Sequence, residues 1–309
     1  MFKRFLKVFT SFFIIFILVF VGANLYINNA DNYVKPTGNY SNDSLDSISF
    51  LLMGVDVQDS KKNSNLRADT LMVFNVNKSS GEISILSIPR DTRTAIEGRK
   101  YKEKINHAYA YGGPELTLKT VSNLLNINLD YYVVVDYKFV EEFVDIIGGV
   151  EVEVPMDMKY EDPVADPPLY IDLKAGLQTL DGDEAMQFLR FRKGYKNADL
   201  GRIDAQQSFM TSLVKETLRF KNVIKAPLIY KVYNENVDTN IPLNTIVKYG
   251  LKFNKYDLAN KNSEVLPGSS KMMNGISYYV HSEDKTEKLI KEMFPNYNDF
   301  ATMGKINNN

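Results

Sequence analysis

The chain has 309 residues, of which 44% are hydrophobic and 24% charged, and its 37 basic residues nearly balance its 38 acidic ones. This composition is typical of a globular protein and argues against disorder, a collagen-like chain or a multi-span membrane protein. The sequence contains no cysteine and only two histidines, which excludes disulfides, a thiolate nucleophile, Cys-ligated metal centres and a multi-histidine metal site. A net charge of −1 gives no reason to expect a nucleic-acid partner.

The N-terminus joins a basic segment to a long apolar one. Residues 1–7 contain three basic side chains, and residues 8–30 carry no charge. An uncharged stretch of this length crosses a hydrocarbon core of ~30 Å as one helix. We therefore expect a cytoplasmic tail over 1–7 and an uncleaved transmembrane anchor over 8–30, with the remainder outside the cell. A cleaved signal peptide is the alternative, but its apolar region is normally shorter and ends in a small-residue cleavage site.

A polar segment over residues 31–45, with Pro36 and Gly38, has the composition of a linker. We expect residues 46–309 to form one extracytoplasmic domain. Without residues 1–30 the chain has 34 basic and 38 acidic residues, a net charge of −4. An acidic, outward-facing domain is a poor candidate for nucleic-acid binding.

The predicted elements mix strands and helices along the whole of this domain. Apolar runs predict strands over 48–56, 70–76 and 83–88, the last two joined by a tight turn into a hairpin. There follow a helix over 114–125, a strand over 131–135, a helix over 139–147, a strand over 150–154, an exposed excursion over 156–172, and helices beginning at 181 and 202. The last ninety residues indicate two helices, a strand over 276–280 and a closing helix. One α/β domain is the simplest architecture that accommodates this order.

Arginine and aspartate recur at the ends of these elements. They are Asp56, Arg67, Asp69, Arg90, Asp91, Arg190, Arg192, Asp199 and Arg202. Any one pair alone is more simply a weak surface ion pair. The whole set favours a phosphorylated ligand held through a divalent metal, because guanidinium groups match phosphate oxygens and magnesium prefers carboxylate and phosphate ligands. The predicted chemistry is activation of a phosphoryl centre by charge and positioning.

An ordered series of motifs resembles the LytR–CpsA–Psr family. The motifs are FLLMGVD ending at Asp56, Arg67-Ala-Asp69-Thr70, SIPRDT ending at Thr92, KINHAY starting at Lys104, Gly112-Gly113, Gly148-Gly-Val150, Arg190-Phe-Arg192, and Asp199-Leu-Gly-Arg202 with Gln206. The resemblance implies a mixed-sheet α-β-α domain behind the membrane anchor. It implies an enzyme, mainly of Gram-positive bacteria, that moves a glycopolymer such as wall teichoic acid or capsule from polyprenyl pyrophosphate to peptidoglycan.

Carried over residue by residue, the resemblance also implies roles in the site. Asp56 and Asp69 would hold Mg²⁺ or Mn²⁺. The donor would be bound by Arg67, Arg90, Lys104, Arg190, Arg192, Arg202 and Gln206. Asp91 and Asp199 would orient arginines, or one of them would deprotonate the acceptor hydroxyl, and the identity of the general base stays open. The family takes the polyprenyl chain into an apolar pocket between sheet and helices.

Three positions need separate treatment. Ala205 stands where the family commonly has arginine, on nearly the same helical face as Arg202. We expect the missing arginine either to weaken pyrophosphate binding or alter the rate, or to be compensated by Lys193 or Lys196. His107 is either a structural hydrogen-bonding residue, the interpretation we favour, or a catalytic base. His281 is expected at the surface.

Two other functions stay open. A polyprenyl-pyrophosphate phosphohydrolase would use water instead of a sugar hydroxyl at the same site. A non-catalytic envelope regulator would need no phosphoryl chemistry at all.

Overall fold

The computed structural model describes residues 47–55, 66–77, 79–164, 168–195, 199–217, 219, 222, 225–242, 245–246 and 257–294. The predicted tail, anchor and linker lie outside these ranges. Within them, no helix has the length and apolar character needed to cross a membrane.

The centre of the fold is a mixed six-stranded sheet in the order β11-β6-β1-β2-β3-β12. Its strands are β11 (Asp238–Thr239), β6 (Tyr131–Val135), β1 (Ser47–Val55), β2 (Ala68–Asn77), β3 (Glu82–Ser87) and β12 (Asp257–Val265). β1 pairs antiparallel with β2 and parallel with β6, and the predicted β2–β3 hairpin is confirmed by antiparallel pairing. The α/β class predicted from the sequence is therefore confirmed.

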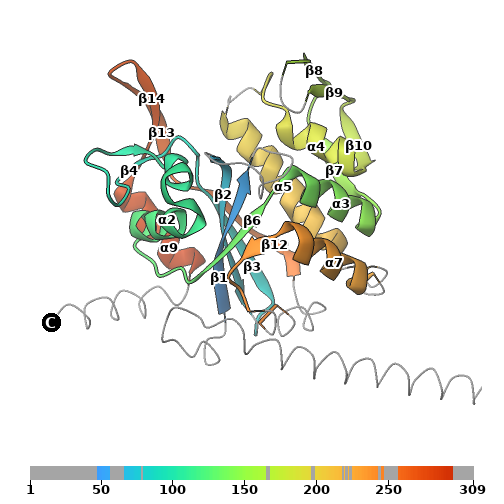
Figure 1. Cartoon of the computed structure of the whole chain (residues 1–309), viewed down its shortest axis with the longest axis horizontal. Coiled ribbons are helices and arrows are strands. Elements are labelled where there is room, and N and C mark those ends of the chain that lie inside the picture. Colours follow the sequence, from blue (N-terminus) through green and yellow to red (C-terminus); the bar gives the residue numbers. More distant parts are fainter. Residues whose placement is uncertain are drawn as a thin grey trace, which may run out of the picture.

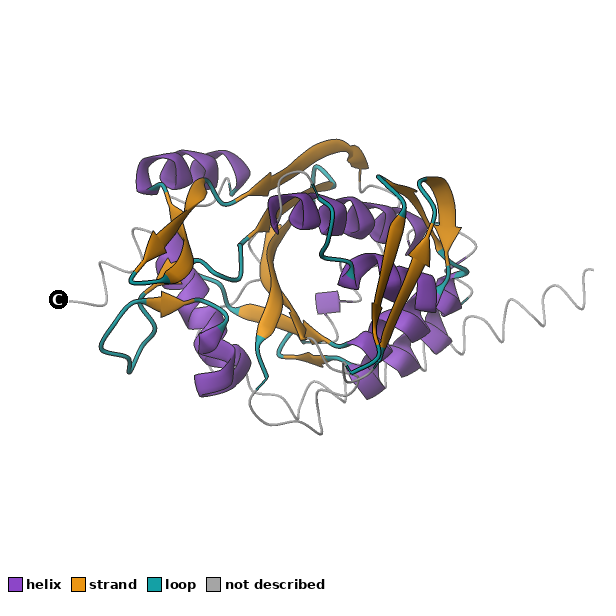
Figure 2. Ribbon diagram, turned by 90° about the horizontal axis from the view of Figure 1, so that it is seen from above, coloured by secondary structure: helices purple, strands orange, loops and turns teal. Residues whose placement is uncertain are grey.

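Helices cover both faces of this sheet. Figure 1 shows α2 (His107–Leu125) and α9 (Glu283–Met293) on one side, and α3 (Tyr137–Ile147), α4 (Gly182–Arg190), α5 (Asp199–Thr217) and α7 (Ala226–Asn236) on the other. The view from above in Figure 2 shows the same two groups of helices with strands between them.

The two faces of β1 explain this layering. Leu51 and Met53 belong to the core cluster that also contains Val121 of α2 and Ile290 of α9. Leu52 belongs to the cluster on the opposite face, against which Met210 of α5 packs. Because successive side chains of a strand point to opposite faces, one continuous apolar run packs against helices on both faces of the sheet.

A second apolar core lies beyond the sheet, between α3, α4, α5 and two small hairpin-like pairs. β7 (Val150–Val154) pairs with β10 (Gly176–Leu180), and β8 (Met158–Asp162) pairs with β9 (Leu169–Leu173). The exposed excursion expected over 156–172 is an antiparallel pair of strands in which alternate residues are exposed, and the prediction missed the strands and their buried residues. Met158 and Ile171 are buried there, because apolar residues alternate along both strands while Asp and Pro gather where the strands end.

The helix α2 is interrupted at the paired glycines. Gly113 has φ +64° and ψ −156°, a left-handed conformation that favours glycine, and Pro114 starts the second segment. The predicted helix from residue 114 is therefore confirmed, and an unpredicted first segment begins at His107. This first segment presents its residues independently of the longer second one.

A C-terminal hairpin is fastened to the segment that follows β3. It consists of β13 (Gly268–Met273) and β14 (Ile276–His281), and Figure 1 shows it standing beside β4 (Arg93–Thr94). The N–H of Tyr279 donates to the main-chain oxygen of Asp91 at 2.9 Å. The predicted strand near 276–280 and the closing helix are confirmed, and the hairpin brings β14 next to Asp91.

Candidate functional site

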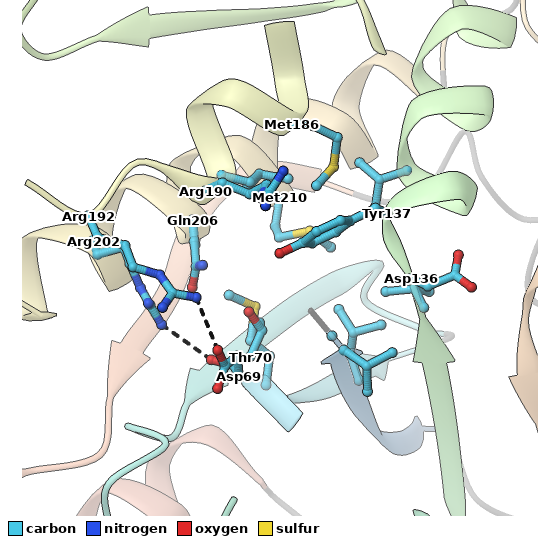
Figure 3. A pocket seen from close by; sticks show the side chains of 17 residues that line it. Asp69, Thr70, Asp136, Tyr137, Met186, Arg190, Arg192, Arg202, Gln206 and Met210 are labelled. Atoms are coloured by element: carbon cyan, nitrogen blue, oxygen red, sulfur yellow. Dashed lines mark hydrogen bonds and ion pairs between the residues drawn. The ribbon is translucent and has the colours of Figure 1, made fainter. Parts of the chain in front are cut away.

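Asp69 is the meeting point of three arginines from distant parts of the chain. Arg90 Nη1 lies 2.8 Å and Arg192 Nη2 lies 3.0 Å from the same carboxylate oxygen, Oδ2. Arg202 Nη2 donates to the main-chain oxygen of Asp69 at 3.3 Å. Figure 3 shows Arg192 and Arg202 directed at Asp69 from one side. The result is a concentration of positive charge around one carboxylate at the end of the central strands.

The hairpin geometry explains why Asp69 and Arg90 meet. Asp69 is near the start of β2, and Arg90 follows the end of β3. In an antiparallel hairpin the start of one strand lies beside the end of the other, as the pairing of Met72 with Ser87 shows. Arg202 reaches the same place from the first turn of α5 and is 4% exposed. A buried, always-charged guanidinium needs anionic or carbonyl partners, and Asp69 supplies its main-chain oxygen to Arg202.

Arg190 is held differently, by an aromatic ring. Its guanidinium carbon lies 4.7 Å from the centre of the Tyr137 ring, within the range of a cation–π contact. Tyr137 is the first residue of α3, and Arg190 is the last of α4. Figure 3 shows the guanidinium of Arg190 above the tyrosine ring. The contact therefore orients a cation toward the space between these two helices.

An apolar cavity of about 100 Å³ occupies that space. Its walls include Leu52 and Met72 of the sheet, Val140 of α3, Met186 and Leu189 of α4, and Met210 of α5. Its mouth is polar and charged, being formed by Asp69, Arg190, Arg192, Arg202 and Gln206. The cavity therefore suits an amphiphile with an apolar chain and an anionic head.

A polar cavity of about 650 Å³ adjoins the apolar one at Asp69, which lines both. Its walls are Arg67, Arg90, Asp91, Lys104, Asn106 and His107, with Ile276 and Tyr278 contributed by β14. Lys104 Nζ and Asp91 Oδ1 form an ion pair at 2.8 Å. Because Asp69 lines both cavities, a ligand bound at the arginines is accessible from an apolar side and from a polar side.

Glu103 in β5 (Glu103–Lys104) organises the wall of the polar cavity. Its carboxylate lies 3.1 Å from His107 Nδ1, accepts from the Tyr111 hydroxyl at 2.7 Å, and accepts from Arg99 Nε at 3.0 Å. These hydrogen bonds, that of His107 first, lower the pKa of Glu103 from 4.5 to about 2. Glu103 is therefore ionised at neutral pH.

Comparison with known proteins decides the family. The sequence profile of the LytR_cpsA_psr family matches residues 21–294. The chain belongs to this family. The teichoic acid transferase TagU of Bacillus subtilis is 33% identical to it over 248 residues, which cover 80% of this chain and 77% of TagU. TagU of Halalkalibacterium halodurans is 34% identical over 250 residues, with 80% and 78% coverage.

Solved structures of LytR–CpsA–Psr proteins share the fold. Bacillus subtilis TagV superposes with a TM-score of 0.71 at 30% identity, over 82% of this chain and 97% of TagV. TagT bound to LI-WTA superposes with a TM-score of 0.65 at 26% identity, over 85% of this chain and 94% of that one. The mixed α/β fold around a central sheet is therefore that of the family.

The structure distributes the predicted site residues of this LytR–CpsA–Psr protein over one region. Asp69, Arg90, Arg192 and Arg202 form the central cluster. Arg190 and Gln206 line the apolar cavity, and Arg67, Asp91 and Lys104 line the polar one. Asp56 lies outside the described residues, and the same holds for the side chain of Asp199, although its backbone begins α5.

The expectation for residue 205 was wrong about its surroundings. Ala205 packs in the second apolar core with Phe188 and Phe209, while Arg202 and Gln206 line the cavity. Three residues along a helix fall 60° short of a full turn, and here that offset moves residue 205 off the cavity wall. The Lys193 ammonium lies 4.2 Å from the centre of the Tyr160 ring, and Lys196 is outside the described residues.

His281 was expected at the surface. It is half-buried, and burial lowers its pKa.

Several residues of the site were not predicted. Tyr137 and Tyr278 were missed, as were Glu103 and Tyr111. Tyr137 had a usable signal, since it follows the predicted strand 131–135 just as other site residues follow strands. Tyr278 had none, because only the tertiary fold brings β14 to this cavity.

Proposed function

We propose that this protein transfers a glycopolymer from polyprenyl pyrophosphate to peptidoglycan with the help of Mg²⁺ or Mn²⁺. The observation that supports this most is the arginine cluster at the mouth of an apolar cavity. Isoprenoid chains leave water for apolar walls, and pyrophosphate oxygens are bound by guanidinium groups. One ligand that satisfies both surfaces at once is a polyprenyl pyrophosphate.

The size of the apolar cavity limits how much lipid it holds. At about 100 Å³ it is smaller than the ~300 Å³ of an ordinary small-molecule pocket. The structure therefore has room for the part of the lipid nearest the pyrophosphate. We expect α3 and α5 to separate when a longer stretch of the chain enters.

Asp69 and Asp56 are the proposed metal ligands. Asp69 offers one carboxylate, and among the described residues no group of three acidic or histidine side chains gathers as a complete metal cage. This fits magnesium, which commonly takes one or two carboxylates and completes its shell with phosphate oxygens and water. A metal bound there would neutralise charge on the transferred phosphate, while the arginines bind the remaining oxygens.

The relatives' names support wall teichoic acid as the polymer. Those proteins are named for teichoic acid transfer, and the structure of TagT is described as bound to LI-WTA. Capsule and related polymers remain compatible with the same pyrophosphate site, because the arginines would bind phosphate oxygens and not a particular sugar.

We propose that residues 8–30 anchor the protein in the cell membrane with the site outside the cell, where peptidoglycan lies. Topology is tested by fusing a reporter that is active only outside the cytoplasm after residue 309. Reporter activity supports the orientation, and a cytoplasmic C-terminus contradicts it.

The decisive experiment separates transfer from hydrolysis. The full chain in detergent is incubated with Mg²⁺, a polyprenyl-pyrophosphate-linked disaccharide and peptidoglycan oligomers, and the products are identified by mass spectrometry. Transfer yields a phosphodiester-linked conjugate and polyprenyl phosphate. Hydrolysis yields phosphorylated saccharide without conjugate, which would support the phosphohydrolase, and no turnover at all would support a regulator.

A further inference from the structure

The polar cavity contains a histidine to which the proposed function assigns no role. His107 is the first residue of α2, and its side chain is 25% exposed. It lines the same cavity as Asp69 and Arg90, the residues of the central cluster. A ligand at the arginines is therefore bordered by an imidazole on its polar side.

Hydrogen bonding assigns the tautomer of this imidazole. Nδ1 lies 3.1 Å from Oε2 of Glu103, and Glu103 also accepts from Tyr111 and Arg99. An ionised carboxylate only accepts hydrogen bonds, so neutral His107 must carry its proton on Nδ1. Nε2 then retains a lone pair and can accept a proton. The same division of roles between carboxylate and imidazole makes histidine a base in hydrolase triads.

The arrangement of the cavities sets the direction of attack. In phosphoryl transfer the incoming and leaving oxygens lie roughly in line on opposite sides of phosphorus. With the lipid in the apolar cavity, the leaving polyprenyl phosphate lies on that side of Asp69. The polar cavity shares Asp69 with the apolar one and is lined by His107, so it is the space that can admit the nucleophile to the same phosphorus.

We propose that His107 is the general base of the transfer, receiving the proton of a peptidoglycan sugar hydroxyl that enters the polar cavity. The hydroxyl oxygen forms a bond to the phosphorus that bears the glycopolymer. The bond from that phosphorus to the bridging oxygen breaks, and its electron pair leaves on polyprenyl phosphate. The hydroxyl proton passes to Nε2 and later to water. This inference rests on the proposed function and names the acceptor side of the same site.

Charged groups of both signs face this imidazole. The carboxylates are Glu103, Asp69 and Asp91, and the cations are Arg67, Arg90 and Lys104. Asp69 is paired with Arg90, and Asp91 is paired with Lys104. Glu103 is the carboxylate that contacts the imidazole ring directly. Glu103 is accordingly the positioning residue in this proposal.

The test compares the chain's two histidines in the conjugate-forming assay with the full chain. General-base catalysis contributes about 10²- to 10⁴-fold, so His107→Gln is expected to lower kcat by that factor. Binding of the lipid-linked disaccharide, measured separately, is expected to stay unchanged. His281→Gln, which removes the histidine that lines neither cavity, is the matched control and is expected to retain wild-type kcat.

Three further readouts separate catalysis from structure. Glu103→Gln keeps the shape of the carboxyl group but removes its charge, and is expected to lower kcat at least about tenfold without changing donor binding. The pH profile of wild-type kcat/KM is expected to change in His107→Gln, because the substitution removes the proposed base. Added imidazole is expected to restore part of the activity of His107→Ala.

The outcomes distinguish this inference from the function it rests on. Absence of conjugate with the wild-type chain contradicts the proposed function and this inference together. Conjugate formation by the wild type with undiminished kcat in His107→Gln contradicts the inference alone. If His107→Ala binds donor normally and imidazole restores none of its activity, the inference is likewise overturned.

Discussion

The two cavities that meet at Asp69 are built from different parts of the fold. The apolar cavity lies between the central sheet and α3, α4 and α5, where the side chains are packed by regular elements. The polar cavity is formed by the segment that leads into β2, by the segment that follows β3, by β5 and the start of α2, and by β14. One cavity therefore belongs to the packed interior, and the other to the connections at the end of the sheet.

This difference suits the two kinds of ligand in the proposed reaction. A lipid is recognised by excluding water, which requires apolar walls but few directed contacts. A sugar hydroxyl is recognised by hydrogen bonds and charges, which require polar groups at defined positions. The comparison predicts that substitutions on the apolar side change donor affinity, while substitutions on the polar side change the rate of transfer.

Among substitutions of the donor-binding residues, the largest effect is expected where the cavities meet. Arg90→Ala removes the guanidinium that contacts Asp69 and lines the polar cavity, and we expect kcat to fall by about 10²- to 10³-fold. Thermal unfolding should change little, since Arg90 is at the margin of the core. Lys291→Ala on α9, which removes an exposed cation from an i,i+4 pair, is the control. Wild-type turnover in Arg90→Ala would refute the pyrophosphate site.

The next-largest effect is expected from a substitution that disturbs the apolar cavity alone. Val140→Asp places a short carboxylate in the wall of the apolar cavity, too short to extend into water, and we expect KM for the lipid-linked donor to rise more than about tenfold. Val140→Thr keeps the side-chain shape and should change KM much less. Binding of inorganic pyrophosphate, measured by calorimetry, should be similar in all three proteins. Equal losses for pyrophosphate and donor would contradict lipid binding in this cavity.

A smaller effect concerns the orientation of Arg190. Tyr137→Leu removes the ring that contacts the guanidinium, and a cation–π contact of about 1 kcal/mol corresponds to about a fivefold loss in kcat/KM. Tyr137→Phe retains the ring and should retain the activity. Equal losses in both variants would point to the tyrosine hydroxyl and not to the ring.

The smallest expected effect is on acid stability and concerns the polar side. Because hydrogen bonding lowers the pKa of folded Glu103 to about 2, this group stabilises the fold fully above its unfolded pKa of about 4.5. That stabilisation is lost as the pH falls from about 4.5 to about 2. The free energy of unfolding of Glu103→Gln, measured by denaturant titration, should therefore fall less than that of the wild type over this range. Parallel curves for the two proteins would contradict this contribution.

The central sheet was predictable because its signals are local. β1, β2 and β3 are apolar runs separated by turn residues, and the Asn77–Gly81 segment marked the hairpin. β8 and β9 were missed because Asp and Pro at their ends obscured the alternation of Met158 with Tyr160. The average composition of such a segment hides the alternation of apolar and polar residues along a strand.

The site was predictable only as a set of residues. The motifs drew attention to Asp69, Arg90 and Arg192, but the contact between Asp69 and Arg192 joins positions 123 residues apart. No local pattern encodes such a distance. Ala205 shows a second limit of the sequence. Helical spacing left the direction of residue 205 uncertain by 60°, and only packing in the second apolar core placed it away from the cavity.

The bond between the Tyr279 N–H and the Asp91 carbonyl has a consequence for how such proteins diversify. It fixes the hairpin over residues 268–281 as a wall of the polar cavity, whereas the apolar cavity is complete by residue 210. The hairpin can therefore vary in sequence without altering the lipid side. In the proposed reaction, substitutions in this one late segment would therefore change the acceptor side of the site, while the donor lipid would still be bound by the sheet and helices.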